Sequence, residues 1–288
     1  IIRWGSQILL YEADPRHVEK LLKELELADC KSVASPGVKP AGELVGVRAN
    51  DGDQSTLSQK LVPVKTRRYR SCTARCNYLS ADRPDIPFPV KELCRAMSSP
   101  EVRHEIALKR LSRYLKGHRR LVQSIPFKDE MDSHLDVYVD SDWAGCRETR
   151  KSTNGGSMTV SGACLKTWSS TQAVLALSSG EAEYYAALKG ASLALGMRSI
   201  AADLGISLSI RLHTDSAAAK GIMLRRGLGK MRHLEVGFLW LQAAVAAKRL
   251  YVFKCRGEDN PADLGTKHLS GEVIGRHLAT LGFSFEEG

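Results

Sequence analysis

The chain has 288 residues, enough for one large or two ordinary domains; 43% of them are hydrophobic and 26% are charged. This globular composition excludes a wholly disordered chain, and no stretch approaches the roughly 20 apolar residues that a membrane span needs. No charged-then-apolar leader follows Ile1, so we expect no signal peptide. The seven cysteines are odd in number and scattered, which favours reduced thiols over a disulfide framework or a zinc site.

The positive charge is concentrated in one segment. The chain carries 42 Lys and Arg against 32 Asp and Glu, a net charge of +10. Residues 65–120 contain 15 basic and 5 acidic side chains, so this segment carries the whole excess. A basic block of this kind indicates contact with a polyanion, most often the phosphates of nucleic acid, although a solvated surface explains the charge equally well.

The first part of the chain, residues 1–130, is predicted to be mainly helical. An apolar strand at 8–11 is followed by a helix that begins at Asp14 and Pro15, where the missing proline N–H costs nothing. Residues 31–60 are rich in Ser, Pro, Gly and Asp and have the composition of a long loop. Two further helices, separated by a proline-rich turn, are expected within 68–97.

A third helix of this part is expected over 101–116 and has a strongly basic outer face. Its leucines share one face, while the other carries the basic side chains Arg103, Lys109, Arg110, Arg113 and Lys116. Such a helix can lie along a phosphate backbone, in which case these side chains bind nucleic acid. Alternatively, the charge only increases solubility.

The second part, residues 131–288, alternates strands and helices. Strands are expected at 135–140, 156–161, 164–169, 210–215 and 250–255. Helices are expected at 181–203, between the 210–215 strand and residue 224, at 232–248 and from residue 260 onward. The resulting order is β-β-β-α-β-α-α-β-α. An antiparallel meander followed by βα units predicts an α/β fold with a mixed sheet and helices on its faces.

Four acidic residues of this part fall at the ends of predicted elements. Asp140 and Asp215 each end a strand, and Glu183 and Asp263 each lie in the first turn of a helix. Several carboxylates packed together repel one another unless divalent cations neutralise them, and Mg²⁺ prefers such oxygen ligands. Taken singly, each acid has a simpler explanation as a helix cap or a partner of the helix dipole. Together, in this β/α order, they favour a metallonuclease.

Five motifs of the second part occur in an order that makes the chain recognisable. They are Asp140–Gly145, Arg150–Thr153, Ser178–Tyr184, Thr214–Ser216 and Ala262–Lys267. With the segments 11–17, 69–86 and 108–117 of the first part, they resemble the end of a copia-type LTR retrotransposon Pol polyprotein. The resemblance implies a ribonuclease H-like five-stranded mixed sheet flanked by helices, preceded by a mainly helical thumb and connection remnant of the reverse transcriptase.

The resemblance also implies roles for the four acids. Asp140, Glu183, Asp215 and Asp263 match the family's catalytic metal ligands, which hold two Mg²⁺ ions, with Mn²⁺ as an alternative. Asp142 is an alternative to Asp140. Glu181 and Glu183 lie about 200° apart on a helix, so only one can face the metals, and Glu183 is preferred because it lies beside the apolar stripe of its helix.

Two departures from the family's pattern are visible in the sequence. Cellular ribonucleases H often have a histidine near the fourth acid, but the stretch 256–260 has none. His233, on the predicted 232–248 helix, fits the family's Lys-x-x-His motif and is expected to approach the nucleic acid, although a plain surface histidine is the simpler alternative. No Asp-Asp pair occurs anywhere in the chain, so the polymerase motif is missing and we expect no DNA synthesis.

The function implied is hydrolysis of the RNA strand of RNA–DNA hybrids during reverse transcription. Its partners would be the hybrid and the remainder of the polyprotein, namely the fingers, palm and integrase, with no membrane. The implied location is the cytoplasm, in a virus-like particle, with the nucleus as an alternative. Two other functions remain open: a catalytically inactive nucleic-acid-binding remnant, and an integrase or resolvase, although the motifs around Glu183 and Asp263 argue against the latter.

Overall fold

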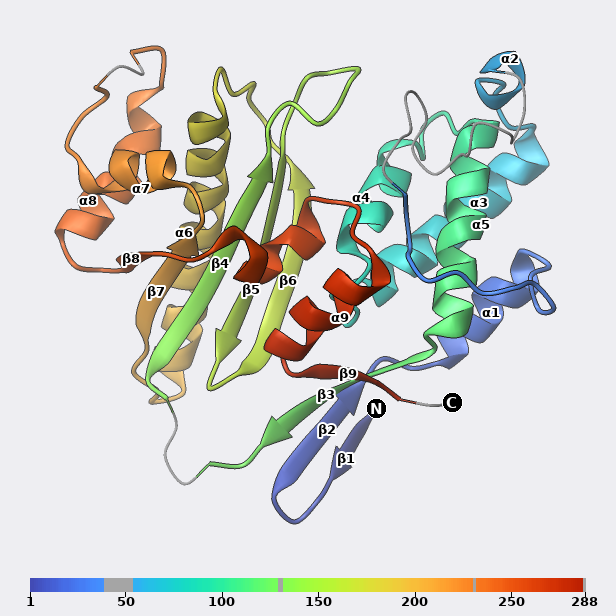
Figure 1. Cartoon of the computed structure of the whole chain (residues 1–288), viewed down its shortest axis with the longest axis horizontal. Helices are drawn as coiled ribbons and strands as arrows, with labels where there is room; N and C mark the ends of the chain where they lie inside the picture. Colours follow the sequence, from blue (N-terminus) through green and yellow to red (C-terminus); the bar gives the residue numbers. More distant parts are fainter. Residues whose placement is uncertain (39–53, 129–131, 230–231, 287–288) are drawn as a thin grey trace. The chain divides into compact units, whose positions relative to one another are not determined.

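The computed structural model describes residues 1–38, 54–128, 132–229 and 232–286 (Figure 1). The chain divides into two compact units. Unit 1 comprises residues 1–126 together with 267–288, and unit 2 comprises residues 127–266. Among the described residues, no helix is both long enough and apolar enough to cross a membrane. The seven cysteines, all of which are described, are free thiols.

Unit 1 combines helices with a small antiparallel sheet. Its helices are α1 (Arg16–Glu24), α2 (Gln54–Leu57), α3 (Pro63–Leu79), α4 (Pro87–Arg95), α5 (Val102–Gly117) and α9 (Gly271–Thr280). Its strands are β1 (Ile2–Trp4), β2 (Ile8–Glu12), β3 (Arg120–Pro126) and β9 (Phe283–Glu286). The helices predicted within 68–97 and over 101–116 are present. Much of the loop predicted at 31–60 lies outside the described residues.

The C-terminal segment packs with unit 1, which corrects the predicted division at 131–288. The sheet order is β1-β2-β3-β9, and β9 pairs antiparallel with β3 from Arg120↔Glu286 to Gln123↔Phe283. Strand β3 would otherwise present an unpaired edge on that side, and β9 satisfies its backbone groups. The first boundary lies close to its predicted place, but the last 22 residues return to the first unit.

Unit 2 is built on the predicted five-stranded mixed sheet. Its strands are β4 (His134–Asp142), β5 (Thr153–Val160), β6 (Ala163–Thr171), β7 (Ser209–Thr214) and β8 (Tyr251–Lys254), in the order β6-β5-β4-β7-β8. The pairs β5·β6 and β4·β5 are antiparallel, and β4·β7 and β7·β8 are parallel. The α/β class, the five strands and the mixed pairing predicted from the sequence are therefore confirmed.

The helices of unit 2 differ in length from those expected. They are α6 (Ser179–Asp203), α7 (Ala217–Leu224) and α8 (Trp240–Ala246), with 3-10 turns η1 (Val236–Leu239), η2 (Gly257–Asp259) and η3 (Pro261–Gly265). The single helix predicted over 232–248 is wrong: residues 232–233 form a turn, followed by η1 and the short α8. Gly237, a weak helix former, lies within η1, and the turn places Leu234 in the core.

Helix α6 packs closely on strand β4 in the core of unit 2. Leu135, Val137 and Val139 of β4 are fully buried in the hydrophobic cluster that α6, α7 and α8 complete (Figure 1). A Cβ added at Gly190 of α6 would lie 2.4 Å from Cγ1 of Val139. The glycine therefore lets the helix backbone come down onto the strand that carries Asp140.

This contact predicts opposite effects for two glycines of α6. Gly190→Ala should destabilise unit 2 by about 1–3 kcal/mol, because overpacking against a buried valine outweighs the better helix propensity of alanine. Gly196→Ala is the matched control: nothing lies within 4 Å of its added Cβ, so it should be neutral or stabilise by up to about 1 kcal/mol. Chemical denaturation of both variants measures the difference, and equal free energies of unfolding would contradict the packing argument.

Candidate metal centre

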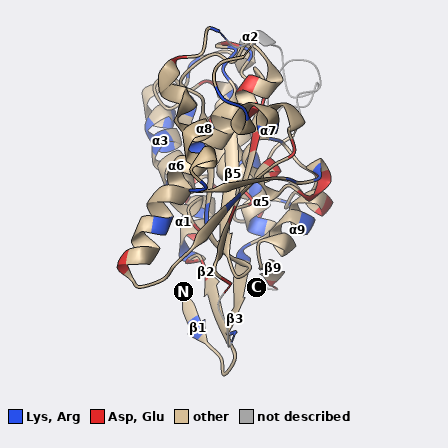
Figure 2. Cartoon of the chain, turned by 90° about the vertical axis from the view of Figure 1, so that its left-hand side faces the viewer, with Lys and Arg blue, Asp and Glu red and all other residues tan. Residues whose placement is uncertain are grey.

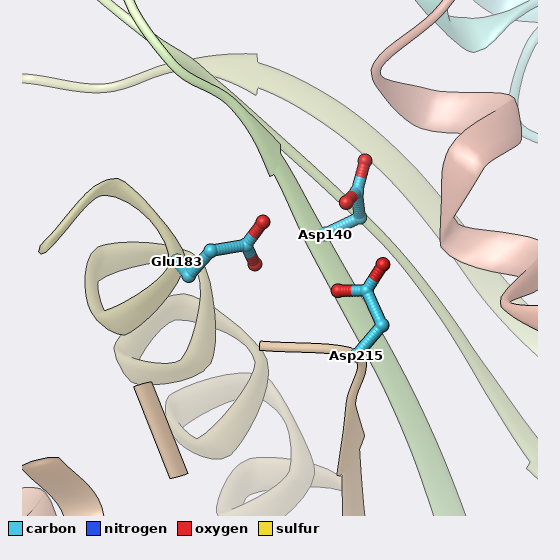
Figure 3. A group of neighbouring side chains, drawn as sticks. All are labelled: Asp140, Glu183 and Asp215. Atoms are coloured by element: carbon cyan, nitrogen blue, oxygen red, sulfur yellow. The ribbon is translucent and has the colours of Figure 1, made fainter. Parts of the chain in front are cut away.

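Three of the four predicted acids come together in unit 2 (Figure 3). Asp140 lies on β4, Glu183 in the first two turns of α6, and Asp215 directly after β7. One carboxylate oxygen of each lies within 4.8 Å of the corresponding oxygens of the other two. Among the described residues, this is the one group of three or more acids, histidines or cysteines with metal-binding spacing.

The fold explains why these three side chains meet. Strands β4 and β7 are parallel and pair Val139 with Thr214, so the next residue of each, Asp140 and Asp215, lies at the same sheet edge. Helix α6 begins there because the Ser178 hydroxyl caps it by accepting a hydrogen bond from the N–H of Glu181. The first turns of α6 then bring Glu183 to the two aspartates.

Asp140 is held from the side of η3. The hydroxyl of Thr266 donates a hydrogen bond to Oδ2 of Asp140, and the Asn260 side chain donates to the carbonyl of Val139 at 3.0 Å. A Cβ at Gly155, which pairs with Asp140 across the sheet, would lie 2.7 Å from the carbonyl oxygen of Ala262. The absence of a side chain at Gly155 therefore lets η3 reach the strand and orient the carboxylate.

A buried glutamine joins the elements that carry Asp140 and Glu183. The side-chain amide of Gln172 donates to the hydroxyl of Ser141 (3.1 Å), the side-chain oxygen of Asn154 (2.6 Å) and the carbonyl of Ala182 (2.8 Å). Ser141 follows Asp140 and Ala182 precedes Glu183, so Gln172 connects the side chain of Ser141 beside Asp140 to the helix backbone beside Glu183. No periodic or motif pattern marks this residue in the sequence, whereas Thr266 and Asn260 lie in or beside the Ala262–Lys267 motif.

The two glutamates of α6 have different surroundings. Glu181 is buried and accepts hydrogen bonds from the N–H of Leu177 and the hydroxyl of Tyr185, both at 3.0 Å. His233 lies 3.0 Å from Glu181, measured from its Nε2 to Oε2, and is exposed on the turn before η1. The structure thus brings Glu183 rather than Glu181 into the acid group, and joins His233 to Glu181.

Asp263 lies on η3 rather than in the first turn of an α-helix. It is outside the group whose oxygens lie within 4.8 Å of one another, while its neighbour Thr266 contacts Asp140. Its role as a fourth ligand stays a prediction. Asp142, the alternative to Asp140, accepts a hydrogen bond from the N–H of Thr153 and also lies outside that group.

The acids affect a thiol at the same sheet edge. Cys255 follows β8, and its N–H donates to the carbonyl of Thr214, the residue before Asp215. Burial, together with the negative charges of Asp215 and Asp140, raises the pKa of the Cys255 thiol to about 11. The thiol is therefore protonated at neutral pH, and the carboxylates supply the charge of the centre.

The basic residues predicted to bind nucleic acid also have partners inside unit 1 (Figure 2 shows the Lys and Arg positions). Arg103 pairs with Glu101 at 2.8 Å, and Arg110 donates to the hydroxyl of Ser35. Arg113 donates to the carbonyl of Lys31, and Lys116 donates to those of Ala28 and Cys30. Arg110, Arg113 and Lys116 therefore hold the 28–35 segment against α5. A guanidinium has five N–H donors, so such an interaction leaves capacity for phosphate.

The oxygen atoms of the acid group suit a hard divalent cation. Two oxygens on opposite sides of one Mg²⁺ lie about 4 Å apart. Carboxylate oxygens up to 4.8 Å apart can therefore bind one ion after a small movement, or can each bind to one of two neighbouring ions. Three carboxylates supply both the ligand type and the negative charge that such ions require. Asp140, Glu183 and Asp215 therefore fit a magnesium or manganese centre.

Comparison with known proteins finds relatives that match most of the chain. The chain is 28% identical to the retrovirus-related Pol polyprotein from transposon TNT 1-94 of Nicotiana tabacum over 96% of its own length. It is 30% identical to that from transposon RE2 of Arabidopsis thaliana over 91%. Over more than nine-tenths of its length the chain is therefore similar to retrovirus-related Pol polyproteins from transposons. The resemblance to a copia-type Pol polyprotein inferred from the motifs is thereby confirmed.

The chain covers a small part of these Pol polyproteins, 21% of the first and 17% of the second. It also matches an uncharacterized mitochondrial protein of Arabidopsis thaliana, with 31% identity over 64% of this chain and 71% of that protein. No family model matches the chain. The solved structure of LC11-RNase H1, isolated from compost, is 18% identical with a TM-score of 0.28, covering 51% of this chain and 99% of that one.

Gln172 provides a prediction about this centre. Gln172→Met should destabilise unit 2 by about 1–3 kcal/mol, because it removes the donor from the buried Asn154 side-chain oxygen and one hydrogen bond from the Ala182 carbonyl. It should also weaken Mn²⁺ binding, since the segments that carry Asp140 and Glu183 then lose the hydrogen bonds that join them. Denaturation and calorimetric Mn²⁺ titration measure the two effects separately.

Gln242→Met is the matched control for this prediction. Gln242 is also buried and donates to the carbonyls of Ile222 and Gly227, away from the acid group. The control should lose similar stability but keep its Mn²⁺ affinity. If the two variants change Mn²⁺ affinity equally, Gln172 has no particular role at the centre.

Proposed function

We propose that unit 2 is a divalent-metal-dependent endonuclease that hydrolyses the RNA strand of RNA–DNA hybrids. The observation that carries the proposal is the convergence of Asp140, Glu183 and Asp215 within 4.8 Å from three different elements. Similarity to retrovirus-related Pol polyproteins supports a substrate that arises during reverse transcription. The resemblance of the five motifs to ribonuclease H domains supports cleavage of RNA.

The acid group would hold two Mg²⁺ ions, or Mn²⁺ ions, with Asp263 as a proposed fourth ligand. Bound there, the ions would supply activation of the attacking water and stabilisation of the leaving alkoxide. Thr266 orients the Asp140 carboxylate, and Gln172 keeps the strand carrying Asp140 and the helix carrying Glu183 in register. Selection of a hybrid over DNA would rest on the 2′-hydroxyl and on groove shape rather than on base identity.

The substrate would be bound by cations outside the acid group. We assign this role to Arg103, Arg110, Arg113 and Lys116 of α5, in the segment that carries the whole positive excess. We also assign substrate binding to His233, because its side chain is exposed. Its contact with Glu181, two residues before Glu183 in the chain, holds it at the start of α6. The remainder of a Pol polyprotein, with the fingers, palm and integrase, would be the covalent partner.

The acid group predicts loss of cleavage when one ligand loses its charge. Asp140→Asn should abolish Mg²⁺-dependent cutting of a labelled RNA–DNA hybrid, because an amide cannot supply the anionic ligand that the ions need. Asp203→Asn, at the exposed end of α6, is the control and should cut like the unmodified chain. A gel assay with hybrid and double-stranded DNA measures both activity and selectivity.

Two outcomes of this assay would contradict the proposal. Equal cutting of double-stranded DNA and hybrid would show a general nuclease. Absence of cleavage by the unmodified chain, despite tight hybrid binding, would favour the inactive nucleic-acid-binding remnant instead.

The basic face of α5 predicts a change in salt dependence. Replacing Arg103, Arg110 and Arg113 together with Ala should weaken hybrid binding and flatten its salt slope by about 0.9 for each phosphate that is no longer neutralised. Replacing the same three with Lys keeps the charge and should keep most of the slope. Binding titrations at several salt concentrations measure both variants.

Thermal unfolding is needed beside these titrations, because Arg110 and Arg113 also hold the 28–35 segment. If the Ala variant stays folded and its hybrid binding has the same salt slope as the unmodified chain, the basic face of α5 serves solubility and packing rather than phosphate binding.

A further inference from the structure

Two loops next to the acid group expose large apolar side chains. Trp143, Leu175 and Leu177, here called the Trp143 patch, are 56%, 52% and 67% exposed. Trp143 follows Asp140 by three residues on the β4–β5 loop, and Leu177 precedes Glu183 by six on the β6–α6 loop. Clustered apolar exposure of this kind is typical of a binding surface.

The two loops are joined to each other at this patch. The indole N–H of Trp143 donates to the carbonyl of Ala176 at 3.1 Å, between Leu175 and Leu177 in the chain. The ammonium of Lys151 donates to the carbonyl of Ala173 at 2.8 Å. The indole is therefore tied by its edge to the neighbouring loop while more than half of its surface faces solvent.

The β4–β5 loop is also ordered internally. The N–H of Ala144 donates to the hydroxyl of Ser152 at 2.9 Å, and the N–H of Arg150 donates to the carbonyl of Cys146 at 2.7 Å. Ala144 and Arg150 have φ values of 53° and 55°, a left-handed conformation that residues other than glycine rarely adopt. Such backbone conformations persist where surrounding contacts enforce them, often at ligand-binding loops. A loop fixed in this way loses little further freedom on binding.

The charges around the patch favour a nucleotide strand as its occupant. Residues 147–151 of the loop contain Arg147, Arg150 and Lys151 against one acid, Glu148. Aromatic and aliphatic groups beside cations match a strand whose bases and sugars are apolar and whose phosphates are anionic. The neighbouring acids, once neutralised by cations, would receive a phosphate of the same strand.

We propose that the Trp143 patch binds nucleotides adjacent to the cleaved phosphate, with the indole stacked on a base or sugar. The proposal rests on the proposed nuclease function, because it takes the substrate of the acid group as the occupant. It adds a non-ionic interaction that the acids and the basic face of α5 do not supply. Trp143 thereby acts in binding rather than in the chemical step.

The test measures binding without cleavage. A fluorescent RNA–DNA hybrid is titrated with the full chain carrying Asp140→Asn, alone and combined with Trp143→Leu. The second variant should bind about 5- to 100-fold more weakly, as expected when the stacking of one base is removed, while Trp143→Phe should retain most of the affinity. Trp4→Leu is the control, since Trp4 is 76% exposed in unit 1, and it should not change the affinity.

Two measurements keep the outcome decisive. Thermal unfolding is recorded for each variant, and Leu177→Ser repeats the test without touching the indole hydrogen bond; it should also weaken binding. Unchanged affinity in both Trp143→Leu and Leu177→Ser overturns the proposal. That result is also the one expected if the partner of the patch is a protein rather than a nucleotide strand. Weaker binding in these variants supports it even if the chain with Asp140 intact fails to cut RNA, so the two proposals fail separately.

Discussion

Mutual repulsion of three carboxylates is the constraint around which unit 2 is built. Asp140, Glu183 and Asp215 would separate if their side chains were free to do so, yet their oxygens lie within 4.8 Å. Parallel pairing of β4 with β7 places two of them at one edge, and the close approach of α6 at Gly190 brings the third. The hydrophobic core thus supplies the free energy that keeps like charges together until cations neutralise them.

The polar side chains around the acids all act on the position of the acids from outside the acid group. Thr266, Asn260 and Gln172 do not belong to the acid group, but each bonds to an acid or to a backbone carbonyl or hydroxyl one residue away. Thr266 and Asn260 come from a segment more than 120 positions from their partners, and all three side chains are buried. Together they convert a flexible group of side chains into a centre with defined orientation, which matters because metal ligands act only in narrow geometric ranges.

The sequence predicted the features that depend on local patterns. Asp140 and Asp215 could be placed because each ends a short alternating strand, and Glu183 could be preferred over Glu181 from the helical stripe beside it. The hydrogen bonds of Gln172 and Thr266 could not be predicted, because they join residues up to 126 positions apart and leave no periodic trace. The pairing of β9 with β3 and the turn at His233 depend likewise on tertiary partners.

The return of the chain to unit 1 has a consequence for synthesis on the ribosome. All of unit 2 is translated between β3 and its partner β9, so the edge of β3 stays without that partner while about 156 residues emerge. Unit 2 can close its own core before unit 1 has its last strand. Shortening the chain from its C-terminal end would therefore reopen a sheet in the unit that was translated first, and expose an edge suited to pairing with other chains.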